Sequence, residues 1–286
     1  MELLTIIKAI ILGIVEGLTE FAPVSSTGHM IIVDDMWLKS QEFLGKYTAN
    51  TFKIVIQLGS ILAVVIIFRK RFIDLLGLKR FSRKEMTAVP DGQPQVSAGG
   101  KLKLGQVIVG LIPAGIFGFL FEDYIDEHLF SISTVLVGLV IGAIFMIIAD
   151  RFAPKQTRTE SVDQITYRQA LSVGLIQCIS LWPGFSRSGS TISGGVLLGM
   201  SHRAAADFTF IMAVPIMAGA SLISLVKNWQ YFTLDALPFF IAGFISAFLF
   251  ALLSMRFFLK LINRIKLLPF AIYRIILAAI VYLVWF

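Results

Sequence analysis

The sequence predicts an all-α polytopic membrane protein, and three observations support this fold class. Hydrophobic residues make up 57% of the chain and charged residues only 15%. The mean hydropathy of +0.83 lies well above that of an ordinary globular domain. Apolar runs of about 20 residues, the length that crosses a bilayer as a helix, recur throughout the 286 residues. We therefore predict a single integral membrane domain over residues 1–286, with the lipid bilayer around it.

The first predicted element is a broken hairpin over residues 3–37. Near its middle, the apolar pattern is interrupted by Gly17, Pro23 and a run of hydroxyl side chains. Because these residues end a helix early, each arm is too short to span a bilayer. We predict a re-entrant hairpin that enters and leaves the membrane on one side.

Three spans, a second broken hairpin and three further spans follow. The second hairpin covers residues 168–200, where Pro183, Gly184 and several serines interrupt the apolar pattern. Each span is apolar over a length that suits a transmembrane helix. The six spans are predicted at residues 52–68, 104–121, 132–149, 208–226, 237–255 and 267–286.

The links between these elements differ in charge. Residues 69–103 carry nine basic and three acidic residues, and residues 150–168 and 256–266 carry four basic residues each. Because short cytoplasmic loops are enriched in Lys and Arg, we place these links in the cytoplasm. The link 122–131 has four acidic residues and no Lys or Arg, which suits the outer side. The first hairpin then enters from outside and the second from the cytoplasm. Topology thus accounts for the net charge of +7, and no nucleic-acid partner is expected.

The two halves, residues 1–149 and 150–286, are predicted to form an inverted repeat. Each half is one re-entrant helical hairpin plus three transmembrane helices, and the odd number of crossings makes the second half start from the opposite face. We therefore expect the two broken tips to meet near the membrane midplane. A shift of 161 residues supports the repeat by aligning GIVE at 13–16 with GLIQ at 174–177, and SSTGH at 25–29 with SRSGS at 186–190.

The cytoplasmic link 69–103 contains a segment rich in Pro, Gly and Ser. This segment, residues 88–100, reads AVPDGQPQVSAGG. Its composition favours a flexible, solvated connection. The basic run before it leaves binding of lipid headgroups as the alternative.

The first tip gathers polar residues that are rare inside a membrane. Its stretch EGLTEFAPVSSTGH, residues 16–29, contains Glu16, Glu20, Ser25, Ser26, Thr27 and His29. The two glutamates are four residues apart and share one helix face. Carboxylates at membrane depth are costly and usually functional, with a surface position as the alternative. Each of the three hydroxyl residues could instead simply cap the next half-helix.

The remaining histidines and the cysteine carry no comparable signal. His128 lies in the acidic outer link and His202 in a cytoplasmic turn, and we predict that both are solvated. With Cys178 as the single cysteine, the chain has no zinc-ligand spacing.

The second tip, WPGFSRSGST at residues 182–191, is suited to bind an anion. A proline and a glycine end one half-helix, and the serines lead into the next, whose N–H groups and positive dipole end favour negative charge. Arg187 adds a guanidinium that can fork onto phosphate or carboxylate oxygens. The alternative is that Arg187 only pairs with Glu16 or Glu20.

Acids and hydroxyls at one tip and a cationic cradle at the other together favour phosphoryl chemistry. Such transfer needs neutralised phosphate charge, an aligned nucleophile and often a divalent cation. Glu16 and Glu20 are the expected ligands of Mg²⁺ or Ca²⁺, because these ions prefer oxygen ligands. A midplane site suits an amphiphile whose phosphate head carries a long hydrocarbon tail, which would lie between spans.

Several stretches closely resemble the bacterial undecaprenyl-pyrophosphate phosphatase family, namely EGLTEFAPVSSTGHM, LWPGFSRSGSTISGG, YRQA and PFAIYR. The resemblance covers essentially the whole chain. It implies a bacterial inner-membrane enzyme that hydrolyses undecaprenyl pyrophosphate to undecaprenyl phosphate, which recycles the lipid carrier for cell-wall synthesis and gives bacitracin resistance. It also implies interdigitated inverted repeats and an active site that opens to the outer, periplasmic side.

The family's motifs fall on Glu16 and Glu20, on Ser25 and Ser26, on His29, and on Ser186, Arg187 and Ser188. We predict that the catalytic residues are Glu16, Glu20, Ser26, His29 and Arg187, and that the substrate-binding residues are Ser25, Thr27, Ser186, Ser188 and Thr191. Arg187 would hold the pyrophosphate, while the two glutamates bind the cation or manage protons. Ser26, His29 and water all stay open as the nucleophile, and His29 is otherwise the general acid or base.

The expected partners are a long-chain prenyl pyrophosphate lipid and the bilayer, with a homodimer left open. A transporter is the alternative from another functional class, because inverted repeats and broken helices are also typical of alternating access. The chain would then move a lipid phosphate across the membrane. Phosphate release in detergent, where there are no compartments, separates the two hypotheses.

Overall fold

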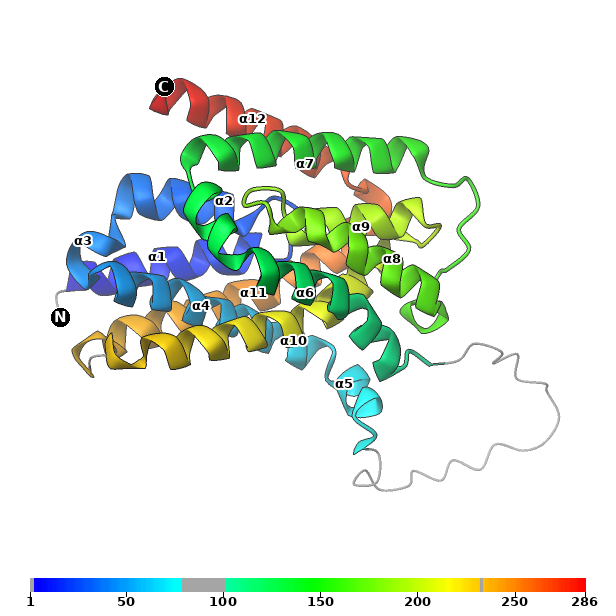
Figure 1. Cartoon of the computed structure of the whole chain (residues 1–286), viewed down its shortest axis with the longest axis horizontal. Coiled ribbons are helices and arrows are strands. Elements are labelled where there is room, and N and C mark those ends of the chain that lie inside the picture. The colour runs from blue at the N-terminus through cyan, green and yellow to red at the C-terminus, as the bar shows by residue number, and fades with distance from the viewer. Residues whose placement is uncertain (1–2, 79–100, 232–233) are drawn as a thin grey trace.

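The computed structural model describes residues 3–78, 101–231 and 234–286, which form a bundle of helices (Figure 1). Within these ranges there is no strand, and the one β feature is an isolated bridge. The predicted linker at residues 88–100, with its alternative of lipid binding, lies outside the described residues. The predicted all-α class is confirmed.

The chain begins with the first broken hairpin. Its elements are α1 (Leu3–Thr19), α2 (Ser26–Met30), the π-helix η1 (Ile31–Leu38) and α3 (Ser40–Leu44). The break lies where the sequence predicts it, but most of the return arm is π-helical. The Lys39 N–H donates to the Asp34 carbonyl oxygen five residues back, which is the π-helical spacing. The Asp34 carboxylate is buried and accepts the N–H of Ser40 at 2.9 Å and its hydroxyl at 2.7 Å, so the end of this arm is firmly held.

Six long helices and a second broken hairpin make up most of the remaining chain. The long helices are α4 (Lys46–Ile67), α6 (Leu104–His128), α7 (Ile132–Phe152), α10 (His202–Asn228), α11 (Leu237–Ile265) and α12 (Leu268–Trp285). The second hairpin comprises α8 (Tyr167–Gln177), η4 (Cys178–Leu181) and α9 (Arg187–Leu197). Short elements connect these parts, namely α5 (Arg69–Leu75), η3 (Val162–Gln164), η5 (Trp229–Tyr231) and η6 (Leu234–Ala236).

Among the described residues, six helices are long and apolar enough to cross a membrane, and they are the six predicted spans. Several extend further than predicted, because hydropathy marks only the part that suits hydrocarbon. The main correction concerns residues 256–266, which were predicted as a loop. α11 continues through this segment to Ile265, with Arg256 and Lys260 exposed and Met255 buried. The basic residues therefore form the polar face of an amphipathic helix end.

The two histidines predicted to be solvated differ in outcome. His128 is exposed at the end of α6, which continues into the predicted link 122–131. The prediction for His202 was wrong, because its Nε2 lies 2.7 Å from Asp150 Oδ1 and both side chains are largely buried. The other oxygen of Asp150 accepts two backbone N–H groups where α12 begins, at 2.8 and 2.9 Å. This carboxylate ties α7 to the starts of α10 and α12.

Asp163 joins the described parts of the long link 69–103. Its carboxylate accepts a hydrogen bond from Arg71 in α5 and another, at 3.0 Å, from the Leu102 N–H just before α6. Burial raises the pKa of Asp163, but the hydrogen bonds from Arg71 and Leu102 and the nearby positive charges outweigh this effect, so the pKa is lowered. The carboxyl group is therefore ionised at neutral pH and holds both ends of the link.

The two hairpins enter the bundle from opposite ends (Figure 1). α1 and α3 lie at the left end of that view, whereas α8 begins at the right end, and the two tips approach each other in the middle. The basic helix α5 lies at the right end, and α6 carries its acidic final turns toward the left end. An inverted repeat requires this opposed entry.

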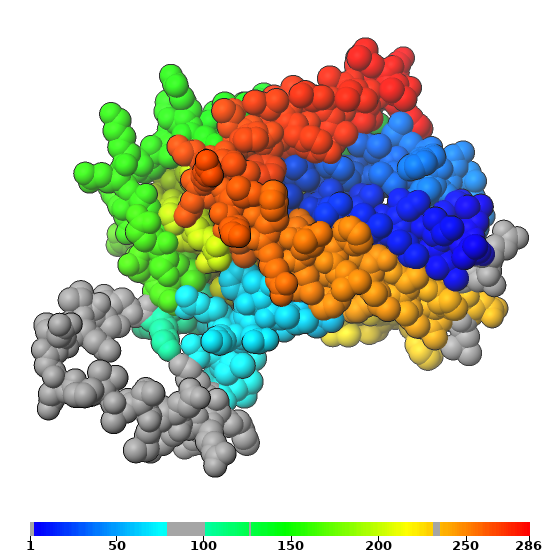
Figure 2. Space-filling view, turned by 180° about the vertical axis from the view of Figure 1, so that it is seen from behind, coloured from blue at the N-terminus to red at the C-terminus, as the bar shows by residue number. Residues whose placement is uncertain are grey.

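Each hairpin packs through a glycine against a long helix of the other half. Gly13 of α1 lies against Gly243 of α11, and Gly174 of α8 lies against Gly110 of α6. Figure 2 shows from behind that α1 (blue) lies beside α11 (orange). Gly13 and Gly174 are also the residues that the shift of 161 aligns. The two crossings are thus equivalent in residue type and in position along the hairpin arm.

These close crossings predict that Gly13→Ala and Gly174→Ala lower the melting temperature in detergent. A Cβ at Gly13 would press on the Gly243 carbonyl oxygen and would lie 2.9 Å from Ser246 Cβ. Overpacking of this kind costs about 1–3 kcal/mol. Gly115→Ala is the matched control, because a Cβ there meets no atom within 4 Å. Equal melting temperatures for Gly13→Ala and Gly115→Ala would contradict the proposed packing.

Candidate functional site

The first tip is the turn between α1 and α2. Glu20 follows the last residue of α1, and its N–H still donates to the Glu16 carbonyl oxygen at 2.9 Å. Ser25 caps α2, because its Oγ accepts the Gly28 N–H at 3.3 Å. Of the three hydroxyl residues proposed as caps, Ser25 takes this role, which leaves Ser26 and Thr27 free to face elsewhere.

The second tip repeats this local geometry. Ser186 caps α9, and its Oγ accepts the Gly189 N–H at 3.1 Å. Ser25 and Ser186 have φ angles of +72° and +78°, a region that residues with a side chain rarely adopt. Such strain persists only where the surrounding structure enforces it, and it is concentrated at functional sites. Two serines that are 161 residues apart thus hold the same unusual conformation.

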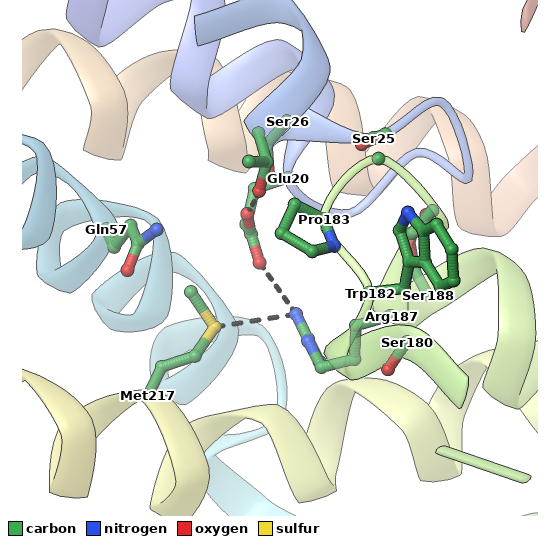
Figure 3. Close-up of a pocket in the computed structure, with 13 residues that line it drawn as sticks. Glu20, Ser25, Ser26, Gln57, Ser180, Trp182, Pro183, Arg187, Ser188 and Met217 are labelled. Atoms are coloured by element: carbon green, nitrogen blue, oxygen red, sulfur yellow. Dashed lines mark hydrogen bonds and ion pairs between the residues drawn. The ribbon is translucent and has the colours of Figure 1, made fainter. Parts of the chain in front are cut away.

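The two tips enclose a cavity of about 180 Å³ (Figure 3). Of the ten predicted site residues, those that line it are Glu20, Ser25, Ser26, Thr27, Ser186, Arg187 and Ser188. The Ser188 hydroxyl also donates to the Ala22 carbonyl oxygen at 3.2 Å, which joins the second tip directly to the first. The structure therefore brings the acidic tip and the cationic tip together, as the sequence predicts.

Glu20 is the central side chain of this cavity. Its Oε1 lies 2.7 Å from Arg187 Nη2, and its Oε2 accepts the Ser26 hydroxyl at 2.6 Å. Figure 3 shows Glu20 between Ser26 and Arg187. Both charged side chains are mostly buried, with 7% of Glu20 and 16% of Arg187 exposed. Arg187 therefore does pair with a glutamate, as the alternative prediction states. The same glutamate, Glu20, also accepts the hydrogen bond of the Ser26 hydroxyl.

Two polar atoms next to this chain of contacts have no hydrogen-bond partner. They are Arg187 Nη1 and Glu16 Oε1, and both are inaccessible to solvent. Buried polar atoms are normally satisfied. Arg187 lines the cavity, so its free donor suits an anion, whereas Glu16 lies beneath the cavity beside Glu20, so its free oxygen suits a cation or a proton shared with that carboxyl group. A phosphate bound together with a cation meets both needs.

Three predicted site residues do not line the cavity. Glu16 is buried beneath it, close enough to Glu20 and Arg187 to interact with both charges. His29 lies 2.8 Å through Nδ1 from the Ser25 carbonyl oxygen and 2.7 Å through Nε2 from the Tyr273 hydroxyl, so both ring nitrogens are engaged. The Thr191 hydroxyl donates to the Arg187 carbonyl oxygen at 2.8 Å and so supports the first turn of α9.

The cavity also contains residues that the sequence did not reveal. Gln57 of α4 and Met217 of α10 face Glu20 and Arg187, and the Met217 sulfur lies 3.4 Å from Arg187 Nη2 (Figure 3). Ser180 and Trp182 line the wall formed by the second hairpin. The Trp182 indole N–H donates to the Thr134 carbonyl oxygen at 2.9 Å and anchors this wall to α7. Of these four residues, only Trp182 lies within one of the sequence motifs described above, so it alone could have been identified as a site residue from the sequence.

A larger groove adjoins the cavity. It has a volume of about 920 Å³ and shares Ser180 and Arg187 with the cavity. Its walls are mainly apolar residues of α6 and α10, including Leu111, Phe119, Ile216 and Ile223, with contributions from α4 and the second hairpin. At Gly115 and Gly219 a Cβ would meet no atom within 4 Å, so these glycines leave the groove open. The groove leads from Arg187 to the ion pair of Glu122 with Lys227, at 3.1 Å.

The donor set for a metal ion is small. In the part of the chain that the structure describes, no group of three or more His, Cys, Asp or Glu side chains is placed to hold one. The predicted cation ligands are thus the two carboxylates of Glu16 and Glu20. Glu16 has an unpartnered oxygen, whereas both oxygens of Glu20 already contact Ser26 or Arg187. Any cation here would need phosphate oxygens or water as further ligands, as Mg²⁺ commonly has.

Comparisons with known proteins agree with the resemblance seen in the motifs. The family model described as bacitracin resistance protein BacA matches residues 9–280. The chain is 75% identical to the undecaprenyl-diphosphatase of Geobacillus sp. (strain WCH70) and 68% identical to that of Anoxybacillus flavithermus (strain DSM 21510 / WK1), in both cases over 100% of each chain. It is 61% identical to the undecaprenyl-diphosphatase of Bacillus subtilis (strain 168), over 99% of each chain.

Proposed function

The chain belongs to the bacitracin resistance protein BacA family, and we propose that its cavity removes the terminal phosphate of undecaprenyl pyrophosphate. The products are undecaprenyl phosphate and inorganic phosphate. The reaction recycles the lipid carrier for cell-wall synthesis and protects against bacitracin, which sequesters the pyrophosphate. The observation that carries this proposal is the contact chain from Ser26 through Glu20 to Arg187 at the junction of the two tips.

Arg187 and the first turn of α9 bind the pyrophosphate in this proposal. The unpartnered Nη1 of Arg187 supplies a donor that no protein atom uses. The positive end of α9, a helix of 11 residues, faces the same cavity and favours an anion. When phosphate oxygens contact the guanidinium, they replace the Glu20 carboxylate, because both kinds of oxygen accept the same forked donors.

Ser26 is the nucleophile that the geometry supports best. Its hydroxyl already donates to Glu20 Oε2 at 2.6 Å, so Glu20 can take the proton as the serine oxygen attacks the terminal phosphorus. The bond from phosphorus to the bridging oxygen then breaks, and undecaprenyl phosphate leaves. Water hydrolyses the phosphoserine to release phosphate and restore the hydroxyl. Direct attack by water stays the alternative, whereas both ring nitrogens of His29 are already engaged.

A divalent cation, Mg²⁺ or Ca²⁺, fits beside this chain of contacts. The observation in its favour is the buried Glu16 Oε1, which has no hydrogen-bond partner. Glu16 would hold the ion, together with Glu20 once Arg187 contacts phosphate instead. When bound, such an ion neutralises charge on the phosphate oxygens.

The apolar groove between α6 and α10 takes the isoprenoid tail in this proposal. The groove and the cavity share Arg187 and Ser180 as lining residues, so a lipid would place its head at the tips and its tail along the groove. Most ligand pockets are lined by apolar side chains with a few polar groups that fix orientation. The open space at Gly115 and Gly219 gives the tail room between the two helices.

We further propose that the two halves are inverted repeats and that the cavity opens to the outer side of the bacterial inner membrane. The equivalent glycine crossings and the matching caps at Ser25 and Ser186 support the repeat. The basic end of the bundle supports a cytoplasmic position for the start of the second hairpin. The groove ends near Glu122, at the acidic end, which supports an outward opening.

The first test is phosphate release from undecaprenyl pyrophosphate by the full chain purified in detergent. We expect release that falls when a chelator removes divalent cations and returns when Mg²⁺ or Ca²⁺ is added. The opposed hairpins also favour the transporter alternative, which needs compartments and predicts no release in detergent. Absence of release by folded protein, with retained transport in vesicles, would contradict the proposal.

The contact chain predicts that Glu20→Gln and Arg187→Ala each lower turnover by about 10² to 10⁴. Glu42→Gln is the matched control, because Glu42 forms an exposed ion pair with Lys39 at 3.3 Å and should leave turnover unchanged. Rapid quenching with labelled substrate should trap phosphate on Ser26. Near-normal turnover of either site variant at unchanged expression would overturn the assignment, and label on no residue would favour attack by water.

The groove predicts a dependence on tail length. Gly219→Phe fills the groove, so kcat/KM for undecaprenyl pyrophosphate should fall by about 10-fold or more, on the scale of apolar pocket contacts. Farnesyl pyrophosphate, with a much shorter tail, should be hydrolysed as by the unmodified protein. Ile245→Phe, on the exposed face of α11, is the control for added bulk. An equal loss for both substrates would show that the tail lies elsewhere.

A further inference from the structure

Arg274 of α12 is a fully buried arginine that forms no ion pair within the described residues. Its Nη2 donates to the Gly184 carbonyl oxygen at 2.9 Å and to the Gly138 carbonyl oxygen at 3.2 Å. Its Nη1 lies 3.4 Å from the Met146 sulfur, and its Nε has no partner. The positive charge is therefore held by two carbonyl dipoles and a polarisable sulfur, with no carboxylate among the hydrogen-bond partners of the guanidinium in the described part of the chain.

Such a charge is expensive to keep. Removing an ion from water costs several kcal/mol even after relaxation, and a carboxylate partner normally offsets part of that cost. Ionisable residues inside membranes are rare and are functional by default. An apolar residue in this packed position would avoid the cost, so the charge is expected to have a function at this position.

The guanidinium lies directly behind the second tip. Gly184, which accepts the shorter hydrogen bond, lines the cavity. A Cβ at Gly189, in the first turn of α9, would lie 3.2 Å from Arg274 Nη1. The charge of Arg274 thus lies against the same helix end that starts with Arg187. It adds to the positive end of the helix dipole from a point that the substrate does not touch.

The neighbouring residue reaches the other tip. Tyr273 stacks on His29, with ring centroids 5.7 Å apart and an angle of 5° between the ring planes. His29 Nδ1 must donate to the Ser25 carbonyl oxygen, since a carbonyl only accepts, so in the neutral ring Nε2 accepts from the Tyr273 hydroxyl at 2.7 Å. α12 runs along the back of the bundle beside the first hairpin (Figure 2). Two consecutive residues of this helix thus hold the two tips.

We propose that Arg274 and Tyr273 are positioning residues of the phosphate site. Arg274 holds the loop at Gly184 and supplies an uncompensated positive charge behind the first turn of α9, and Tyr273 holds the first tip through His29. Neither residue touches substrate. The inference rests on the proposed function for its substrate, but its direct readout is the affinity for inorganic pyrophosphate, which needs no turnover.

Arg274→Met and Arg274→Lys separate charge from shape. Met removes the charge, whereas Lys keeps it but cannot fork onto two carbonyl oxygens. We expect pyrophosphate, measured by the increase it causes in melting temperature, to bind Arg274→Met about 10-fold or more weakly. The pyrophosphate affinity of Arg274→Lys should lie between those of Arg274→Met and the unmodified chain. KM should rise in the reverse order, from the unmodified chain through Arg274→Lys to Arg274→Met. Arg256→Met, on the exposed face of α11, is the control for loss of a distant charge.

Two outcomes would overturn the role of Arg274. One is an unchanged pyrophosphate affinity in Arg274→Met, with any loss of activity explained by the loss of thermal stability. The other is an affinity in Arg274→Lys as low as that in the uncharged Arg274→Gln, which would show that the charge contributes nothing and would decide the question if Arg274→Met does not fold. Failure of the proposed function is distinguishable, because the unmodified chain would then release no phosphate.

Tyr273→Phe tests the other tip. This variant keeps the stacked ring and loses only the hydroxyl that fixes His29. We expect kcat to fall about 10-fold, the loss of one buried hydrogen bond, while pyrophosphate affinity stays unchanged because the cradle is intact. An unchanged kcat, or a loss of pyrophosphate affinity equal to that of Arg274→Met, would show that Tyr273 does not act through the first tip.

Discussion

The buried ion pair of Glu20 with Arg187 is the interaction on which the site depends. The two residues come from hairpins that enter the bundle from opposite ends, and both lie where little water reaches them. Their attraction is therefore much stronger than that of a surface pair, and separation of the tips would leave two unpaired charges in a medium of low dielectric. The same pair connects structure to chemistry, because Glu20 also accepts the Ser26 hydroxyl. In the proposed mechanism, a phosphate that binds Arg187 frees this carboxylate to act on the serine.

The surrounding fold makes this contact possible inside a membrane. A broken helix exposes backbone N–H and C=O groups that lipid cannot satisfy. Here the serine caps at Ser25 and Ser186 satisfy part of that need, and the Ser188 hydroxyl reaches across to Ala22. Glycine crossings at Gly13 and Gly174 bring each hairpin close to a helix of the other half. The strained serines and the buried charges stand at the same junction, which is where backbone strain is usually tolerated.

The sequence predicts the spans, the two breaks and the meeting of Glu20 with Arg187, because hydropathy, helix-breaking residues and loop charge are all local signals. It does not predict contributions from residues such as Gln57 and Met217, since they lie on uninterrupted helices and the helix rotation that turns them inward depends on packing. The sequence also does not predict which way the His29 ring points, because its partner Tyr273 is 244 residues away in the chain. The sequence predicts a loop at the basic end of α11, because hydropathy does not distinguish a solvated helix from a loop.

A structure of the chain with a non-hydrolysable, methylene-bridged analogue of undecaprenyl pyrophosphate tests the central claim most directly. The account predicts that the diphosphate lies between the tips, with Arg187 moved from Glu20 to the phosphate oxygens, Ser26 facing the terminal phosphorus and the tail between α6 and α10. A diphosphate bound elsewhere, with the contact of Glu20 and Arg187 intact, would contradict it.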